Sequence, residues 1–185
     1  MPEVESTAKS IGAAPTMNIM DGSPRYTVPI IHDSTTGKVV SDSFRIAEYL
    51  DETYPDTPRI IPAGTRMLQS SFCTLIFTTF APLLPIIRPV TVANFLPPEV
   101  GEALKKVFGE GAGFRLIAQG YESSADSPFV MGGARPTFAD IFMTGFLWWI
   151  QLALGDTQGW KDILALGDGK IGRLFEETLA GCAKK

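Results

Sequence analysis

The hydrophobic pattern near the start of the chain is first that of strands and then that of a helix. Residues 26–31 are β-branched and apolar, residues 33–37 form a polar turn that ends in a glycine, and residues 38–40 are again apolar in part. Residues 41–43 are all of helix-capping types, and the apolar residues behind them recur at three- and four-residue spacing. The pattern predicts a β-hairpin followed directly by a helix.

The later pattern is helical. Apolar residues that share one helix face begin at Leu68, and the prolines after them are expected to bend or end that helix. Residues 137–154 are apolar almost all round, as in a central helix, and Thr137 with Asp140 predicts a capping box at its start. These two side chains are therefore assigned a structural role. Shorter helices are predicted at 3–11, 98–108, 163–166 and 171–179, with a loop at 13–25 and a tail from Cys182.

A proline-rich stretch separates the two patterns. Residues 55–64 contain three prolines and end in a glycine, which predicts a stiff linker. The expected organisation is a first domain over residues 1–54 and an all-helical domain over residues 65–185. The run 68–87 carries no charge and is as long as the roughly 20 residues of a membrane span. Its prolines and polar residues favour a helix buried in the bundle instead.

Composition and charge exclude several classes of function. Of 185 residues, 45% are hydrophobic and 19% are charged, which is typical of a soluble globular protein. The net charge of −4 lies entirely in residues 1–60, with five basic and nine acidic side chains, because residues 61–185 carry eleven of each. The sequence contains no basic patch, so nucleic-acid binding is not expected. Two cysteines without a pairing pattern and an acidic, non-hydrophobic start favour the cytoplasm, and a single histidine gives no metal site.

Two features of the hairpin carry candidate chemistry. Pro29 interrupts an otherwise good strand, which predicts a sheet edge and a sharp bend such as a cis peptide bond provides. A peptide-like ligand could pair with that edge through Val28. The start of the helix at Ser43 offers N–H groups to a carboxylate. These positions together predict a site for an extended, anionic tripeptide.

This combination resembles a known family. Val28-Pro29 followed by Asp42-Ser43-x-x-Ile46-x-x-Tyr49-Leu50 resembles the second half of the thioredoxin-like domain of glutathione transferases, in which the proline is cis. Arg135-Pro-Thr-Phe-Ala-Asp140 resembles the capping box that opens the core helix of their all-helical domain. The stretches Tyr26-Thr-Val-Pro-Ile-Ile-His-Asp33 and Asp51-Glu-Thr-Tyr-Pro55 are most similar to those of fungal transferases related to bacterial β-etherases. The resemblance implies an α+β fold, namely the C-terminal part of a thioredoxin-like domain (a β-hairpin plus a helix) followed by a helical bundle.

The resemblance also implies a ligand and a site. Glutathione is the expected co-substrate, held by Val28, Asp42 and Ser43, while Pro29 shapes the loop. Members of the family activate the bound thiol with a Tyr, Ser or Cys just after the first strand. Residues 1–25 resemble the second helix and its following loop, so the opening strand-helix-strand unit is expected to be missing, as in a truncated chain. No catalytic residue is therefore assigned.

Two functions stay open. One is a transferase that, given the missing segment, conjugates glutathione to a small hydrophobic electrophile or cleaves aryl ethers. The other is a non-catalytic relative that binds ligands or partners through the helical domain. Many members of the family form homodimers, and the unpaired edge of the predicted hairpin would favour association.

Overall fold

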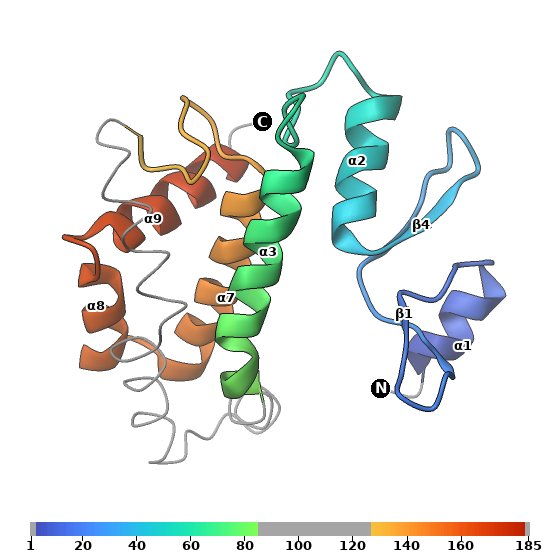
Figure 1. The fold of residues 1–185 in the computed structure, drawn as a ribbon, viewed down its shortest axis with the longest axis horizontal. Coiled ribbons are helices and arrows are strands. Elements are labelled where there is room, and N and C mark those ends of the chain that lie inside the picture. Colours follow the sequence, from blue (N-terminus) through green and yellow to red (C-terminus); the bar gives the residue numbers. More distant parts are fainter. Residues whose placement is uncertain (1–2, 85–126, 184–185) are drawn as a thin grey trace. The chain divides into compact units, whose positions relative to one another are not determined.

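The computed structural model describes residues 3–84 and 127–183 (Figure 1). The chain divides into two compact units, Met1–Ile61 and Pro62–Lys185. The division falls inside the stretch predicted as a linker, while the predicted domain limits themselves stay a prediction. The predicted helix at 98–108 lies outside the described residues.

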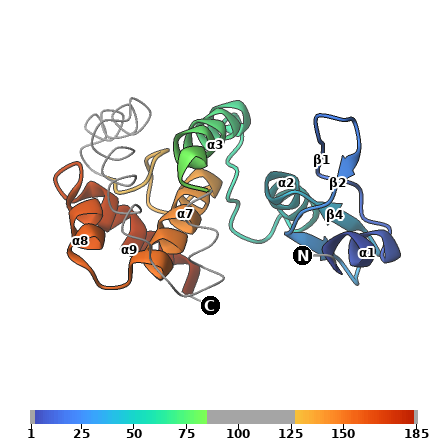
Figure 2. The ribbon, with the colours of Figure 1, turned by 90° about the horizontal axis from the view of Figure 1, so that it is seen from below.

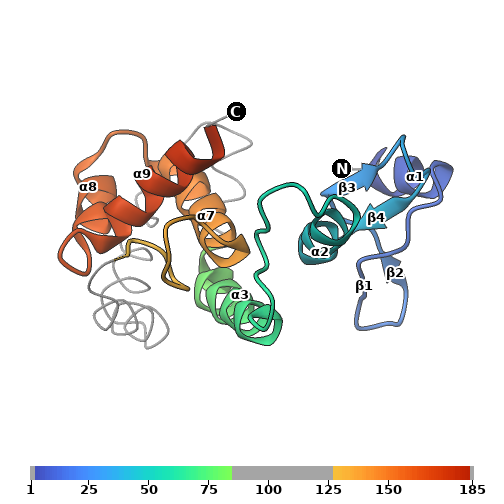
Figure 3. The same ribbon diagram turned by 90° about the horizontal axis from the view of Figure 1, so that it is seen from above.

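The first unit contains two small antiparallel sheets and two helices (Figure 3). Its elements in chain order are α1 (Glu3–Ser10), β1 (Met17–Asn18), β2 (Pro24–Arg25), β3 (Ile30–His32), β4 (Val39–Ser41) and α2 (Ser43–Thr53). β1 pairs with β2 inside the stretch that was predicted to be a loop, which corrects that prediction. Two-residue strands carry too few positions to show an alternating pattern.

The β3–β4 hairpin is shorter than predicted and begins later. Ile30 lies opposite Ser41, and His32 lies opposite Val39. Thr27 is held outside this sheet, because its N–H and hydroxyl both donate to the Thr16 hydroxyl, at 3.2 and 2.9 Å. The peptide bond between Val28 and Pro29 is cis, as the resemblance implied. The predicted strand from residue 26 is therefore wrong over its first four residues.

The helix α2 begins at an unusual cap. Asp42 is the N-cap, with a φ of 81°, and one of its carboxylate oxygens accepts from the N–H groups of Phe44 and Arg45 at 3.0 and 3.1 Å. Ser43 is the first residue of the helix and not its cap. Near the other end of α2, the buried Asp51 accepts from the N–H groups of Ile60 and Ile61 at 3.1 and 2.8 Å. The chain after α2 is thereby bound back to it.

The second unit is helical, as Figures 1 and 2 show. It consists of α3 (Arg66–Phe80), a 3-10 turn η1 (Ala81–Leu83), α7 (Phe138–Leu154), α8 (Gln158–Ala165) and α9 (Lys170–Ala183). α7 packs against α3 on one side and against α8 and α9 on the other. Every one of these elements contributes to the core. The largest fully buried hydrophobic side chains are Ile76, Phe80, Leu83, Met143, Leu147, Ile150, Ile171 and Leu174.

The predicted inner face of α3 needs one correction. Leu68 is 60% exposed, whereas its neighbour Gln69 is fully buried. The Gln69 side-chain oxygen accepts from the Ala139 N–H at 3.0 Å, and its amide donates to the Thr65 hydroxyl at 2.8 Å. A polar contact between helices thus replaces the expected apolar one. At the C-terminus, α9 extends to Ala183, so Cys182 lies in a helix and not in a tail.

The start of α7 is fixed by a buried carboxylate. One oxygen of Asp140 accepts from both the N–H and the hydroxyl of Thr137, at 2.8 and 2.7 Å. Its other oxygen accepts from the Val130 N–H at 2.7 Å. Burial raises the pKa of this carboxyl, against the opposing effect of these hydrogen bonds. Asp140 therefore joins the segment before α7 to the first turn of the helix.

In the part of the chain that the structure describes, no helix is long and apolar enough to cross a membrane.

Candidate functional site

The hairpin brings the predicted ligand-binding residues to one place. Val28 and Pro29 lie just before β3, and Asp42 and Ser43 lie just after β4. Because Ile30 pairs with Ser41 at the open end of the hairpin, the positions next outward are Pro29 on one side and Asp42 on the other. The edge residue and the helix start therefore meet at the same end of the sheet.

The free edge of β3 can be derived from the register. Asp33 donates its N–H to the Lys38 carbonyl at 2.9 Å, which marks that pair as a hydrogen-bonded one. Antiparallel pairs alternate, so Ile31 with Val40 is the next hydrogen-bonded pair. Ile30 and His32 then direct their N–H and C=O groups away from β4. Within the described residues β3 pairs with β4 alone, and this outer edge is open.

The start of α2 offers groups of both charges. The cap uses one oxygen of Asp42 and the N–H groups of the second and third helical residues. The N–H of Ser43 is not engaged by this cap and lies at the positive end of the helix dipole. A positive φ in a residue other than glycine costs on the order of 1–3 kcal/mol and is concentrated at functional sites. Asp42 is such a residue, at the predicted site.

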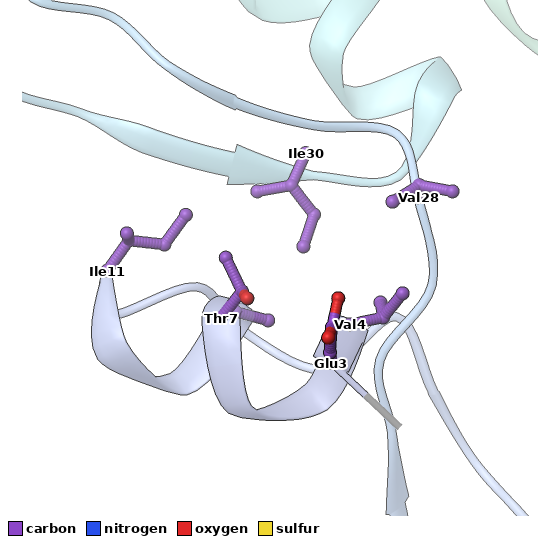
Figure 4. Close-up of a pocket in the computed structure, with 7 residues that line it drawn as sticks. Glu3, Val4, Thr7, Ile11, Val28 and Ile30 are labelled. Carbon is purple, nitrogen blue, oxygen red and sulfur yellow. The ribbon is translucent and has the colours of Figure 1, made fainter. Parts of the chain in front are cut away.

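A pocket lies beside Val28 (Figure 4). Its volume is about 280 Å³, and the figure shows side chains of α1 facing Ile30 and Val28 across it. Its lining consists of Glu3, Val4, Thr7, Ala8, Ile11, Val28 and Ile30. Most of these side chains are apolar, and among the described residues that line the pocket Glu3 alone is charged. The pocket therefore suits an apolar group and disfavours the carboxylates of an anionic tripeptide.

Asp33 was interpreted from the sequence as a turn former only, but the structure gives it more partners. One of its oxygens accepts from the hydroxyls of Tyr49 and Tyr54, each at 2.6 Å, and the other accepts from the Thr35 N–H at 2.8 Å. The hydrogen bond from Tyr49, followed by that from Tyr54, lowers the pKa of this carboxyl. The same bond to Asp33 raises the pKa of Tyr54. The tyrosines are 16 and 21 positions away, which is why no local pattern predicted the cluster.

Tyr49, Tyr54, Cys73 and His32 do not have the surroundings of an activated nucleophile. The hydroxyls of Tyr49 and Tyr54 are both engaged by Asp33. Burial raises the pKa of the Cys73 thiol to about 12, so it stays protonated at neutral pH. His32 is exposed at the end of β3. Over residues 3–84 and 127–183, no group of three His, Cys, Asp or Glu side chains could hold a metal ion.

Comparison with known proteins identifies the family. Residues 4–53 match the model of the glutathione S-transferase N-terminal domain, and residues 90–180 match that of the C-terminal domain. A glutathione S-transferase of Ceriporiopsis subvermispora, solved in complex with glutathione, is 32% identical, with a TM-score of 0.79 over 100% of this chain and 82% of its own. A glutathione transferase of Phanerochaete chrysosporium is 31% identical, with a TM-score of 0.79 over 97% of this chain and 80% of its own.

A glutathione S-transferase-like protein of Aspergillus flavus is 24% identical over 219 residues, covering 96% of this chain and 74% of that protein. The family and fold inferred from the motifs are confirmed, and the similar proteins are fungal. The first unit is thioredoxin-like and the second is the helical domain. This chain belongs to the glutathione S-transferase family.

Proposed function

We propose that this chain binds glutathione at the open end of the β3–β4 hairpin. The observation that carries the proposal is the register, since Ile30 opposite Ser41 brings Val28 and Ser43 to the same end of one hairpin. A tripeptide needs both an edge that pairs with its backbone and a positive helix end for its carboxylate. Further support comes from the Ceriporiopsis subvermispora transferases, whose structures contain glutathione.

Each predicted residue has a role that its surroundings permit. Val28 is 65% exposed and presents its backbone to the ligand, while Pro29 shapes the bend. The N–H and hydroxyl of Ser43 receive the γ-glutamyl carboxylate. The ammonium group beside that carboxylate is attracted by Asp42, whose second carboxylate oxygen is not used by the cap. The carboxylate of the γ-glutamyl end thus binds hydrogen-bond donors of Ser43, and its ammonium group lies near the carboxylate of Asp42.

The chemical step after binding has two candidates. Family membership favours transfer of the glutathione sulfur to a small hydrophobic electrophile, or cleavage of an aryl ether. Either reaction needs a neighbouring group that favours the thiolate. The second candidate is non-catalytic binding of glutathione or of hydrophobic ligands, since Tyr49, Tyr54, Cys73 and His32 do not supply such a group. A homodimer, a cytoplasmic location and the domain limits 1–54, 55–64 and 65–185 belong to the same proposal.

Calorimetric titration with glutathione tests the binding site. Ser43→Ala should weaken binding about 10-fold to 100-fold, because a hydrogen bond to a charged group contributes about 1.5–3 kcal/mol. Asp42→Asn keeps a good cap but loses the charge and should also weaken binding. Ser71→Ala, on the exposed side of α3, is the matched control. Equal affinity of Ser43→Ala, Asp42→Asn and the wild type would remove the site assignment.

Activity separates the two candidates. The protein is mixed with glutathione and an aromatic electrophile that carries a halide leaving group, and halide release is measured above the uncatalysed rate. Release that saturates with glutathione supports transfer, whereas binding of glutathione without release supports the non-catalytic function.

A further inference from the structure

The turn of the β3–β4 hairpin and the helix α2 are joined by one carboxylate. Asp33 accepts the N–H groups of Thr35 and Thr36 within its own turn, at 2.8 and 3.4 Å. Its other oxygen accepts hydrogen bonds from two tyrosine hydroxyls. Tyr49 lies in the distal half of α2, and Tyr54 is the C-cap of that helix. A group bonded to both elements fixes one against the other.

Two further contacts strengthen this junction. The Thr36 hydroxyl lies 2.5 Å from the Tyr49 hydroxyl, and the Lys38 ammonium lies 5.0 Å from the centroid of the Tyr49 ring. Tyr49 itself is 8% exposed. The junction is therefore partly shielded from water. Hydrogen bonds to a charged group are stronger in such shielded surroundings than in water.

The junction lies at the opposite end of the hairpin from the proposed glutathione site. At its start, α2 is fixed to the sheet through Ser41 and Asp42 by the chain itself. At its far end, Asp33 holds it through Tyr49 and Tyr54. Without the second attachment, α2 could pivot about its start. Ser43 is at the pivot and would stay in place, but the direction of its N–H group and of the helix axis relative to the edge at Val28 would change.

We propose that Asp33 is a positioning residue that sets the orientation of the helix start at Ser43 relative to the edge at Val28, the two halves of the glutathione site. This inference rests on the proposed function, because it concerns the same site. A ligand that contacts both halves depends on that relative orientation, whereas a ligand that contacts only the start of α2 does not. Asp33 itself does not touch the ligand and acts through Tyr49 and Tyr54.

The test compares two ligands on folded protein. Glutathione contacts both halves, whereas γ-glutamyl methylamide keeps the carboxylate and ammonium but lacks the part that pairs with Val28. Asp33→Asn should raise the dissociation constant for glutathione about fivefold to tenfold and change that for γ-glutamyl methylamide by less than about twofold. Calorimetry measures the first constant, and NMR titration of the weaker ligand measures the second.

The matched control is Asp21→Asn. Asp21 also forms a local turn, accepting from the Ser23 N–H at 2.8 Å, but it lies in the β1–β2 connection, and the hydrogen bonds described for it do not reach a helix. Its substitution should leave both constants unchanged. Should Asp33→Asn fail to fold by far-UV circular dichroism, Tyr54→Phe replaces it, since this variant removes one donor and keeps the carboxylate. Tyr54→Phe should weaken glutathione binding about twofold to fivefold and spare the smaller ligand.

The outcomes are distinct. Selective loss of glutathione affinity in the Asp33 or Tyr54 variant supports the positioning role. Unchanged affinity, or equal weakening of both ligands, overturns it and leaves the binding site standing. If the wild type binds neither ligand, the proposed function itself fails, and the positioning role fails with it.

Discussion

Asp140 provides the sharpest stability test, because its carboxylate is fully buried and receives three donors. In Asp140→Asn the oxygen that faces Val130 can remain an acceptor, while an NH₂ group takes the place of the oxygen that faces Thr137. The Thr137 hydroxyl can rotate to accept from this NH₂. The Thr137 N–H can only donate, so it stays buried against the NH₂ group without an acceptor.

The expected cost follows from these contacts. A buried N–H left without its acceptor costs about 1–3 kcal/mol, and a lost helix cap typically costs about 1 kcal/mol. Both descriptions refer in part to the same bond, so we expect about 2–3 kcal/mol in total. For a protein of 150–250 residues, 1 kcal/mol shifts Tm by about 2–4 °C. The variant should therefore melt roughly 4–12 °C below the wild type.

Urea unfolding followed by tryptophan fluorescence measures the unfolding of the second structural unit, which contains Asp140. All three tryptophans, Trp148, Trp149 and Trp160, lie in the second unit, so the signal reports the unit that contains Asp140. Asp156→Asn is the matched control, because its carboxylate is 85% exposed and its ion pair with Lys161 spans 3.5 Å. An exposed pair contributes about 0–1 kcal/mol. The reasoning is refuted if Asp140→Asn unfolds at the same urea concentration as this control.

Three further predictions concern the pH dependence of Asp140, the hydrogen bond of Gln69 and the reactivity of Cys73. Since burial raises the pKa of Asp140, its titration favours the folded state below pH 3.8, and this contribution is lost as the pH rises through the raised pKa. The stability difference between the wild type and Asp140→Asn, measured by urea unfolding, should accordingly shrink with rising pH, and a difference that grows would contradict this sign. Gln69→Leu should cost about 1–3 kcal/mol by removing the acceptor of the Ala139 N–H, whereas Leu68→Gln at the exposed neighbouring position should be nearly neutral in the same assay. A thiol reagent at neutral pH should modify the exposed Cys182 well before Cys73, as peptide mass spectrometry would show; equal rates would contradict the raised pKa of the Cys73 thiol.

The elements that were predictable from the sequence are those with local signals. The turn before Gly37 and the capping residues before α2 predict the hairpin and helix within a few residues. Thr137 and Gly155 bracket α7, and Gly155 has the positive φ that suits a helix end. In each case the decisive contacts lie within about four residues, where spacing alone is informative.

The features that were not predictable depend on distant partners. Gln69 looks like a surface residue until Ala139, 70 positions later, supplies its hydrogen bond. Asp33 looks like a turn former until Tyr49 and Tyr54 are brought to it by the packing of α2 on the hairpin. The strand edge at Val28 and the helix start at Ser43 indicated a ligand site from the sequence, and the family resemblance identified glutathione as the expected ligand. These roles stay predictions; the structure adds that the two residues lie at the same end of the hairpin.

The hydrogen bonds from Ile60 and Ile61 to Asp51 determine where the molecule can be dissected. A fragment that stopped after Tyr54 would retain the buried Asp51 carboxylate and discard both of its backbone donors. A buried acceptor deprived of its partners costs about 1–3 kcal/mol, and more when it is charged. A fragment that stopped after Ile61 would keep both donors. Limited proteolysis should likewise spare Arg59, which lies beside these bonds, for as long as the first unit remains folded.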